Sequence, residues 1–360
     1  MVSDIIVERG LVKNIGSYEI IPSHKATSPH FLLTDDKVDS FYGDLVLKQF
    51  TDAGYSMRKI VVPAGEETKC LDTFSTVADE MFSYGIDKHT ILFSLGGGVV
   101  NNLAGVLAST LYRGIELMHI STSSMSQADA ALDFKQAINS RMGKNLIGSY
   151  YPASKILIDP EVLLTLTDRH LRNGIAESLK HALTQSQEFY DSLMGYADKL
   201  NDVEVLDDIV RKTVELKVPL LRGAVEDDFN EMLPQYGHSV AHAVEHLSAY
   251  DLYHGEAVTI GICVSAEISL LLGFCDQKTV DAHYELSRAY KLPTSVPKDM
   301  TTEDVINKIR YDKHYVKGLS HMALPVAVGE MWHHNGVYSV PIEYDILEKA
   351  IAINKEKDEG

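Results

Sequence analysis

In the first 160 residues, short apolar runs alternate with segments of helical periodicity. The apolar runs are rich in β-branched and aliphatic residues and end in polar or glycine residues; they are HFLLTDD, RKIVVPAG, TILFSLGGG, ELMHISTS and SKILIDP. Between them stand helix-like segments such as DSFYGDLVLKQFTDAG and TFSTVADEMFSYG. Strands that alternate with helices in this way predict a Rossmann-like α/β domain with a largely parallel sheet.

After about residue 160 the apolar spacing changes to about 3.6 residues, which predicts a mostly α-helical C-terminal domain. VEVLDDIVRKTVELKVPLL and KTVDAHYELSRAYKL both have this spacing. The run IGICVSAEISLLLGF is interrupted by Glu267 and is too short to cross a bilayer, so it predicts a buried helix. Because Asp159-Pro160 ends the last strand-like run, we assign residues 1–165 to the α/β domain and residues 166–360 to the helical domain.

Charge and cysteine content narrow the possible partners and location. The 360 residues carry a formal net charge of −18 and three cysteines without CxxC spacing. An acidic surface repels nucleic acid and anionic membranes, so we expect neither as a partner, and an anionic substrate would need a local group of lysines. MVSDIIVERG lacks the features of a signal peptide. We therefore expect a cytoplasmic protein in a reducing environment.

A glycine turn, Gly96-Gly97-Gly98, stands between the apolar run TILFSL and the helix-like segment VVNNLAGVLAS. This context lets backbone N–H groups approach a phosphate. Asn101 occupies the place of the last glycine of GxGxxG, so spacing alone leaves a plain tight turn equally possible. Polar groups also follow two neighbouring strand-like runs, and these are Glu66, Lys69, Thr122 and Ser123. Because the carboxyl ends of parallel strands share one crevice, these groups favour a dinucleotide.

Lysines gather in DAALDFKQAINSRMGKN, which has no clear helical or strand period and is expected to be a loop. It contains Asp129, Lys135, Lys144 and Asn145. Farther on, ESLKH places Glu177 and Lys180 on one helix face, and ELKVP adds Lys217. A single lysine is usually a solvated surface residue. Together these lysines could form the cationic group that the acidic surface otherwise lacks, because ammonium groups bind phosphate.

Histidines gather in GHSVAHAVEHLSAYDLYHGEAV among small and apolar residues. His238, His242 and Glu245 are spaced i, i+4 and i+7 and share one helical face, with His246 close to it. His254 follows in HGEA. Two histidines from different elements and a glutamate are a common ligand set for a catalytic divalent metal. Histidines on an amphipathic helix are more often structural, so spacing alone leaves both roles open, although the glycines beside two of them permit close approach.

Together these motifs resemble the sugar phosphate cyclase superfamily, whose best-known member is 3-dehydroquinate synthase. The resemblance runs from PAGEETK to HGEAVTIGI and is carried by GGGVVNNLAG, YRG, DAALDFK…GKNLIGSYYP, NGIAESLKHAL and GHSVAHAVE…HGEAV. It implies a dehydroquinate synthase-like fold with an N-terminal α/β domain and a helical C-terminal domain. It also implies NAD, one Zn²⁺ or Co²⁺ and a homodimer.

The resemblance further implies roles for individual residues. Those corresponding to metal ligands are Glu177, His238 and His254. Those expected to contact the substrate are Asp129, Lys135, Asn145, Lys180, Lys217, Gln235, His242 and Arg113, the last reaching a phosphate across the dimer. Those expected to contact the cofactor are Asp36, Glu66, Lys69, Gly97, Gly98, Asn102, Thr122, Ser123, Asp129 and Lys144. Those expected to be catalytic are Lys135, Lys180, His242 and Glu245, the last two as proton shuttles.

Local departures distinguish between members of the superfamily. The 3-dehydroquinate synthases have an aspartate where this chain has Asn102, and a carboxylate-binding arginine and asparagine where it has Glu231 and Gln235. A glutamate cannot pair with a carboxylate at neutral pH, so a carboxylated substrate is disfavoured. The 2-deoxy-scyllo-inosose synthases, with GN, KQAVN and EYGH, resemble the chain better, although they differ from it at Asn101 and Gln235. Valiolone-type cyclases usually lack the histidine corresponding to His242.

The resemblance thus implies a carbon–oxygen lyase that converts D-glucose 6-phosphate to 2-deoxy-scyllo-inosose, a reaction of aminocyclitol antibiotic biosynthesis. The implied steps are transient NAD-dependent oxidation, phosphate elimination, reduction and intramolecular aldol closure. The alternatives are a 3-dehydroquinate synthase, a valiolone-type heptulose 7-phosphate cyclase, a metal-dependent polyol dehydrogenase and a non-catalytic binding protein. A dehydrogenase would release net NADH and would have little need of Lys135, Lys144 and Lys180.

Overall fold

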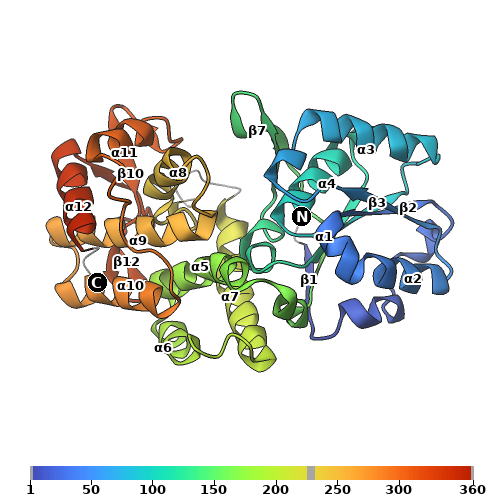
Figure 1. Ribbon diagram of the computed structural model, residues 1–360, viewed down its shortest axis with the longest axis horizontal. Coiled ribbons are helices and arrows are strands. Elements are labelled where there is room, and N and C mark those ends of the chain that lie inside the picture. Colours follow the sequence, from blue (N-terminus) through green and yellow to red (C-terminus); the bar gives the residue numbers. More distant parts are fainter. Residues whose placement is uncertain (1–2, 225–231, 358–360) are drawn as a thin grey trace. The chain divides into compact units, whose positions relative to one another are not determined.

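The chain forms two compact units, Met1–Thr167 and Asp168–Gly360, each described here by itself (Figure 1). The computed structural model describes residues 3–224 and 232–357. In Figure 1 the N-terminal unit runs from blue to green and the C-terminal unit from green to red.

A six-stranded parallel sheet forms the core of the N-terminal unit. In spatial order its strands are β1 (Asp4–Val7), β8 (Lys155–Ile158), β5 (Glu116–Ser121), β4 (Ile91–Gly96), β2 (His30–Asp35) and β3 (Met57–Val62). The helices that follow β2, β3 and β4 include α2 (Asp44–Asp52), α3 (Leu71–Ser83) and α4 (Gly98–Thr110). Every residue of β4 is buried, as expected of an inner strand covered on both faces. The predicted Rossmann-like α/β class is confirmed.

The strand order reverses between β2 and β4. After β2 the chain adds β3 on one side of it and then returns to place β4 on the other side. The register sets Thr34 of β2 beside Leu95 of β4, so the strand ends that precede Asp36 and Gly97 are neighbours. Open parallel sheets bind ligands at the carboxyl ends of their strands where the order reverses.

The lysine-rich segment from Asp129 is not the loop that its irregular period predicted. Strands β6 (Lys135–Ser140) and β7 (Gly143–Tyr150) pair there as an antiparallel hairpin. Residues of β7 are exposed or half-buried along the whole strand, so its sequence has no apolar side to reveal a period of two. At Gly148 the two strands approach so closely that a Cβ would lie 2.0 Å from the carbonyl oxygen of Gln136.

Helix α9 (His254–Leu271) is the central helix of the C-terminal unit. It contacts α5 (Asp168–Gln185), α8 (His238–Leu247), α10 (Gln277–Ala289) and α12 (Tyr344–Glu356). Among the described residues it is the one helix whose length and composition would suit a membrane span, but 78% of it is buried inside the protein. The predicted buried helix is therefore confirmed. The remaining helices of this unit are α6 (Gln187–Tyr196), α7 (Val203–Ala224) and α11 (Thr302–Ile309).

Short strands, which the sequence did not indicate, complete the described part of the C-terminal unit. One antiparallel sheet has the order β13 (Val340–Ile342), β10 (Leu319–Met322) and β9 (Tyr315–Val316), and a second contains β11 (Pro325–Ala327) and β12 (Glu330–Met331). Strands of two to four residues are too short to show an alternating pattern.

Glycines allow α9 to pack unusually close to α5 and α8. A Cβ on Gly261 would lie 2.0 Å from the carbonyl oxygen of Gly237, and a Cβ on Gly255 would lie 1.8 Å from the carbonyl oxygen of Asn173 in α5. Gly237 also has a φ of +77°, a left-handed conformation that favours glycine. The close approach that the glycines beside His238 and His254 were predicted to permit is thus confirmed.

A buried hydrogen-bonded charge network fastens the end of α12 to α9. The Glu267 side chain is 2% exposed and pairs with the ammonium of Lys357. The Tyr284 hydroxyl donates to Glu267 Oε1 over 3.1 Å, and Nδ2 of Asn354 donates to that hydroxyl over 2.8 Å. A buried carboxylate is costly unless it is paired and hydrogen-bonded, so α9 can keep Glu267 because α10 and α12 supply its partners.

A second buried polar network lies in the N-terminal sheet. Nδ1 of His119 in β5 is 2.6 Å from the Ser94 hydroxyl of β4, and Asn101 of α4 donates to the same hydroxyl over 2.9 Å. The Ser126 hydroxyl donates to Asn101 Oδ1. Burial lowers the pKa of His119 to about 3, so this ring is neutral at neutral pH.

We expect Gly261→Ala to destabilise the protein because its Cβ would meet the backbone of Gly237. Forcing a methyl group into a packed helix contact costs about 1–3 kcal/mol. Gly195→Ala is the matched control, since Gly195 also lies in a helix but has no atom within 4 Å of its added Cβ. That change should stabilise the protein by about 0.5–1 kcal/mol. Equal free energies of unfolding for the two variants in urea would show that the contact between Gly261 and Gly237 has room for a methyl group.

Replacing His119 by glutamine should flatten the acid side of the stability profile. The folded pKa of about 3 lies below the unperturbed value of about 6.5, so between these values the unfolded chain binds a proton that the folded chain does not. The contribution of His119 is therefore fully present above about pH 6.5 and is lost as the pH falls, by up to about 1.4 kcal/mol per pH unit.

Urea unfolding at several values between about pH 7 and pH 4 measures this slope. His119→Gln should show a shallower loss of stability than the wild type, whereas His334→Gln, at an exposed position, should keep the wild-type slope. An unchanged slope in His119→Gln would show that this ring is not the group held neutral.

Candidate active site

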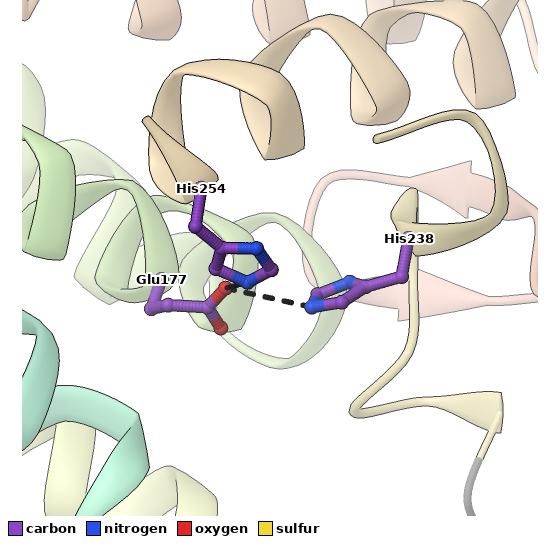
Figure 2. A group of neighbouring side chains, drawn as sticks. All are labelled: Glu177, His238 and His254. Carbon is purple, nitrogen blue, oxygen red and sulfur yellow. Dashed lines mark ion pairs between the residues drawn. The ribbon is translucent and has the colours of Figure 1, made fainter. Parts of the chain in front are cut away.

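Three side chains from three helices converge in the C-terminal unit (Figure 2). Glu177 lies in α5, His238 is the first residue of α8, and His254 is the first residue of α9. One ligand atom from each lies within 4.8 Å of the other two. The Nε2 atoms of the two histidines are each 3.7 Å from Oε1 of Glu177. The structure therefore brings the three predicted ligands together.

The outer ring nitrogens of both histidines have hydrogen-bond acceptors. Nδ1 of His238 is 3.1 Å from the carbonyl oxygen of Tyr236, and Nδ1 of His254 is 3.2 Å from Oε2 of Glu245. Because a carbonyl and a carboxylate only accept, Nδ1 of each ring carries a proton, and Nε2 is the nitrogen that faces Glu177. This arrangement is typical of histidines that bind a metal through Nε2.

The carboxylate of Glu177 is fully buried, and its two oxygens have different surroundings. Its Oε2 pairs with the ammonium of Lys180, whose side chain is 1% exposed, whereas Oε1 accepts no hydrogen bond from the described residues. Burial, and after it the charge of Lys180, lowers the pKa of His238 well below its ordinary value and keeps the imidazole neutral. A carboxylate oxygen and the Nε2 atoms of two imidazoles facing one point fit a divalent cation such as Zn²⁺ or Co²⁺.

Two lysines expected to bind substrate are buried in the same unit. Besides pairing with Glu177, Nζ of Lys180 donates to the carbonyl oxygen of Pro234 over 2.6 Å, so one of its three N–H donors remains. Lys217, in α7, is 1% exposed. Gln235 is half-buried beside Pro234, and its carbonyl oxygen accepts from the backbone of His238 over 3.0 Å. Glu231 lies outside the described residues.

Asp312 belongs to this group of side chains, although the sequence analysis did not identify it. Its carboxylate, 5% exposed, is 3.1 Å from Nδ1 of His242, and the ring of His242 lies beside those of His238 and His254. Burial would raise the pKa of Asp312, but hydrogen bonds from His242 and the backbone of His314 outweigh it and lower the pKa. Asp312 is 70 residues from His242 with no shared motif, so no spacing in the sequence could connect them.

In the N-terminal unit, the glycine turn lies against the end of β5. A Cβ on Gly97 would approach the Ser123 hydroxyl to 3.0 Å, and a Cβ on Gly98 would approach Ala130 to 3.1 Å. The backbone N–H of Thr122 donates to the Gly96 carbonyl over 3.0 Å. The structure therefore brings the predicted turn glycines together with Thr122 and Ser123, at the start of α4, where backbone N–H groups suit a phosphate.

The two asparagines after the turn have different tasks. Asn102 donates to the Gly98 carbonyl over 2.9 Å and accepts from the backbone N–H of Ala137 in β6 over 2.9 Å. An aspartate could accept from Ala137 but could not donate to Gly98. Asn101 is fully buried and hydrogen-bonds to Ser94, so its side chain belongs to the core network. Asn102 therefore joins the glycine turn to the hairpin.

Residues expected near the cofactor on the loop after β3 also contact the hairpin. Glu66 pairs with Lys69 over 3.0 Å and accepts from Asn139 over 2.8 Å. Lys69, 6% exposed, donates to Asn145 Oδ1 over 2.8 Å. Asn145 itself has a φ of +57°, which places it in a left-handed conformation between two strand neighbours.

The remaining predicted residues lie at separate places in the N-terminal unit. Lys135 and Lys144 are on the two strands of the hairpin, and Lys135 Nζ is 3.8 Å from Asp133. Asp129 lies in the helical turn Ser126–Ala130. The exposed Asp36 accepts from the backbone N–H of Ala64 over 3.1 Å, and the exposed Arg113 has a φ of +63°.

The chain matches the family model for the 3-dehydroquinate synthase N-terminal domain over residues 59–173 and that for the C-terminal domain over residues 174–315. A 3-dehydroquinate synthase of Synechocystis sp. is 33% identical over 83% of this chain and 84% of that protein. The chain belongs to the 3-dehydroquinate synthase family of sugar phosphate cyclases. A 2-deoxy-scyllo-inosose synthase of Streptoalloteichus tenebrarius is similarly related to this cyclase, at 32% identity over 95% of the chain and 89% of that protein.

Solved structures share the fold of this cyclase. One is a 2-deoxy-scyllo-inosose synthase complexed with carbaglucose-6-phosphate, NAD+ and Co2+; its TM-score is 0.88 at 22% identity, covering 97% of this chain and 96% of that chain. Another is ValA, a 2-epi-5-epi-valiolone synthase of Streptomyces hygroscopicus subsp. jinggangensis 5008 with NAD+ and Zn2+ bound. Its TM-score is 0.87 at 27% identity, covering 99% of this chain and 98% of that chain. The predicted superfamily and its fold are confirmed.

Proposed function

We propose that this cyclase uses NAD and one Zn²⁺ or Co²⁺ ion to convert D-glucose 6-phosphate to 2-deoxy-scyllo-inosose, as a homodimer. The observation that carries the metal site is the convergence of Glu177, His238 and His254, with both Nε2 atoms 3.7 Å from Oε1. The glycine turn with Thr122 and Ser123 supports the cofactor site. The two similar solved structures, which are described with NAD+ and Co2+ or Zn2+, support the same pair of groups.

The choice of substrate rests on particular positions, because overall identity does not discriminate between the two kinds of relative. Gln235, and Glu231 outside the described residues, stand where the resemblance to 3-dehydroquinate synthases would require carboxylate-binding side chains. Asn102 uses an amide donor that the aspartate of those synthases lacks. A sugar phosphate without a carboxylate fits these differences, and D-glucose 6-phosphate is such a compound.

NAD would supply reversible hydride exchange at carbon 4 of the sugar, and the metal ion would polarise the oxygen on that carbon. Oxidation at carbon 4 acidifies the proton on carbon 5, and loss of that proton expels phosphate from carbon 6. After reduction at carbon 4 the ring opens, and the enolate attacks the aldehyde at carbon 1. The hydride taken at the beginning is returned, so the reaction has no net oxidation.

Side chains of the protein would bind the substrate and transfer protons during these steps. Asp312 accepts from Nδ1 of His242 and so orients this half-exposed ring, which we expect to contact the phosphate. Lys180 has one N–H donor left for a substrate oxygen. By the family resemblance, Lys135 and Asn145 of the N-terminal unit are also expected to contact the substrate. Glu245 accepts from Nδ1 of His254 and would thus orient that ring, in addition to the proton transfer expected of it.

We expect the purified protein, supplied with NAD⁺, Co²⁺ or Zn²⁺ and D-glucose 6-phosphate, to release inorganic phosphate without accumulating NADH, because the hydride returns to carbon 4. A phosphate assay, the absorbance of NADH and NMR of the product measure this. Net NADH formation would indicate a polyol dehydrogenase. Glucose 6-phosphate remaining inert while sedoheptulose 7-phosphate or a carboxylated heptulosonate 7-phosphate reacts would reject the proposed substrate.

We expect Glu177→Ala to abolish the bound ion, because it removes the only carboxylate of the three ligands. Glu245→Gln should weaken the ion by about 10–100-fold, since it removes the negative partner of the His254 ring. Competition with a chromogenic chelator and metal analysis of the dialysed protein measure both. Glu188→Gln, at an exposed position of α6, is the control and should bind as the wild type does. A stoichiometric ion in Glu177→Ala would show that the ligands are wrongly assigned.

A further inference from the structure

The first turn of α9 is joined to α5 by a two-pronged ion pair. Nε of Arg169 is 2.7 Å from Oε1 of Glu256, and Nη2 is 2.8 Å from Oε2. Nη2 also donates to the carbonyl oxygen of Asp251 over 2.7 Å, and the guanidinium lies 3.9 Å from the centre of the Tyr253 ring. The guanidinium of Arg169 therefore contacts two carboxylate oxygens, a backbone carbonyl and the face of an aromatic ring. Together these contacts fix its orientation.

Glu256 uses the same carboxylate to begin the helix. Its Oε2 accepts the backbone N–H of Tyr253 over 2.8 Å, which caps the first turn of α9. On the next residue, the backbone N–H of Gly255 donates to Oδ1 of Asn173 in α5 over 2.7 Å. The chain is therefore tied to α5 on both sides of His254.

The loop between α8 and α9, which leads into this turn, has an unfavourable backbone conformation that the contacts of Arg169 help to hold. Ala249 and Tyr250, between α8 and α9, have φ values of +50° and +68°, which are unfavourable for residues with a side chain. Arg169 holds the Asp251 carbonyl immediately after them. Glu177 lies on the same helix as Arg169, a little over two turns farther along, so α5 carries both the ligand carboxylate and the arginine that locates the next ligand.

We infer that Arg169 and Glu256 are positioning residues for His254: they fix the first turn of α9 against α5 so that Nε2 of His254 meets the Glu177 carboxylate. The inference rests on the proposed metal site. The Arg169 side chain is 51% exposed and that of Glu256 is 12% exposed, so we expect the pair to affect ligand placement more than the stability of the fold. Misplacing one of three ligands weakens the ion without unfolding the protein.

The test compares Arg169→Lys and Glu256→Gln with a matched pair in the same unit. Arg169→Lys keeps the charge but cannot bridge two carboxylate oxygens and the Asp251 carbonyl. The control is Arg211→Lys, because Arg211 pairs with Asp207 in α7 over 2.9 Å. The side chains of that pair are 49% and 17% exposed, against 51% and 12% for Arg169 and Glu256. Zn²⁺ and Co²⁺ affinities of the full chain are measured by chelator competition, and thermal unfolding is measured on the metal-free protein.

Arg169→Lys and Glu256→Gln should each weaken the ion about 10-fold or more, whereas Arg211→Lys should bind it as the wild type does. The unfolding temperatures of the metal-free variants should all change by the same small amount. The double variant of Arg169 and Glu256 should lose little more than either single variant, because both act through one contact. Wild-type affinity in the two single variants would overturn the inference and leave the metal site standing. Absence of binding by the wild type would overturn both.

Discussion

The burial of one carboxylate is the constraint on which the C-terminal unit depends. Oε1 of Glu177 has no donor among the described residues, and a charged oxygen in a protein interior is stabilised only by a cation or a hydrogen bond. Neighbouring side chains compensate this buried charge, and a second set of groups orients those side chains. Lys180 pairs with the other oxygen, two imidazoles face the first, and a carbonyl and a carboxylate set the orientation of those rings. Holding three helices this close requires glycine at their contacts.

The same requirement explains why polar groups persist in the neighbouring core. The carbonyl of Tyr236 orients His238, and the hydroxyl of Tyr236 lies 3.2 Å from the carbonyl of Ile262 and 3.0 Å from Nε2 of His283, two acceptors for its one proton. Burial lowers the pKa of His283 to about 4, so this ring contributes a neutral hydrogen bond and no charge. Polar contacts thus extend from α10 through Tyr236 to the ligand in α8.

Much of the fold, but less of the site, could be predicted from the sequence. The parallel sheet was predictable because its inner strands are continuous apolar runs, and α9 because the apolar run IGICVSAEISLLLGF has one charged interruption, Glu267. The β6–β7 hairpin was missed because an exposed strand shows no apolar side, and the strands of the C-terminal unit were too short to show a period. Helical spacing placed His238, His242 and Glu245 on one face, but only the resemblance to a family joined them to Glu177. Asp312 was missed because it meets His242 through the fold alone.

The end of α12 has a practical consequence for producing the protein. Lys357 is the last described residue, and its ammonium neutralises a carboxylate inside the helix that also bears His254. Removing Lys357 would take the cation from Glu267 and leave this buried carboxylate with the Tyr284 hydroxyl as a donor. Affinity handles are therefore better attached at the opposite terminus, or separated from Lys357 by a flexible spacer that lets its side chain fold back.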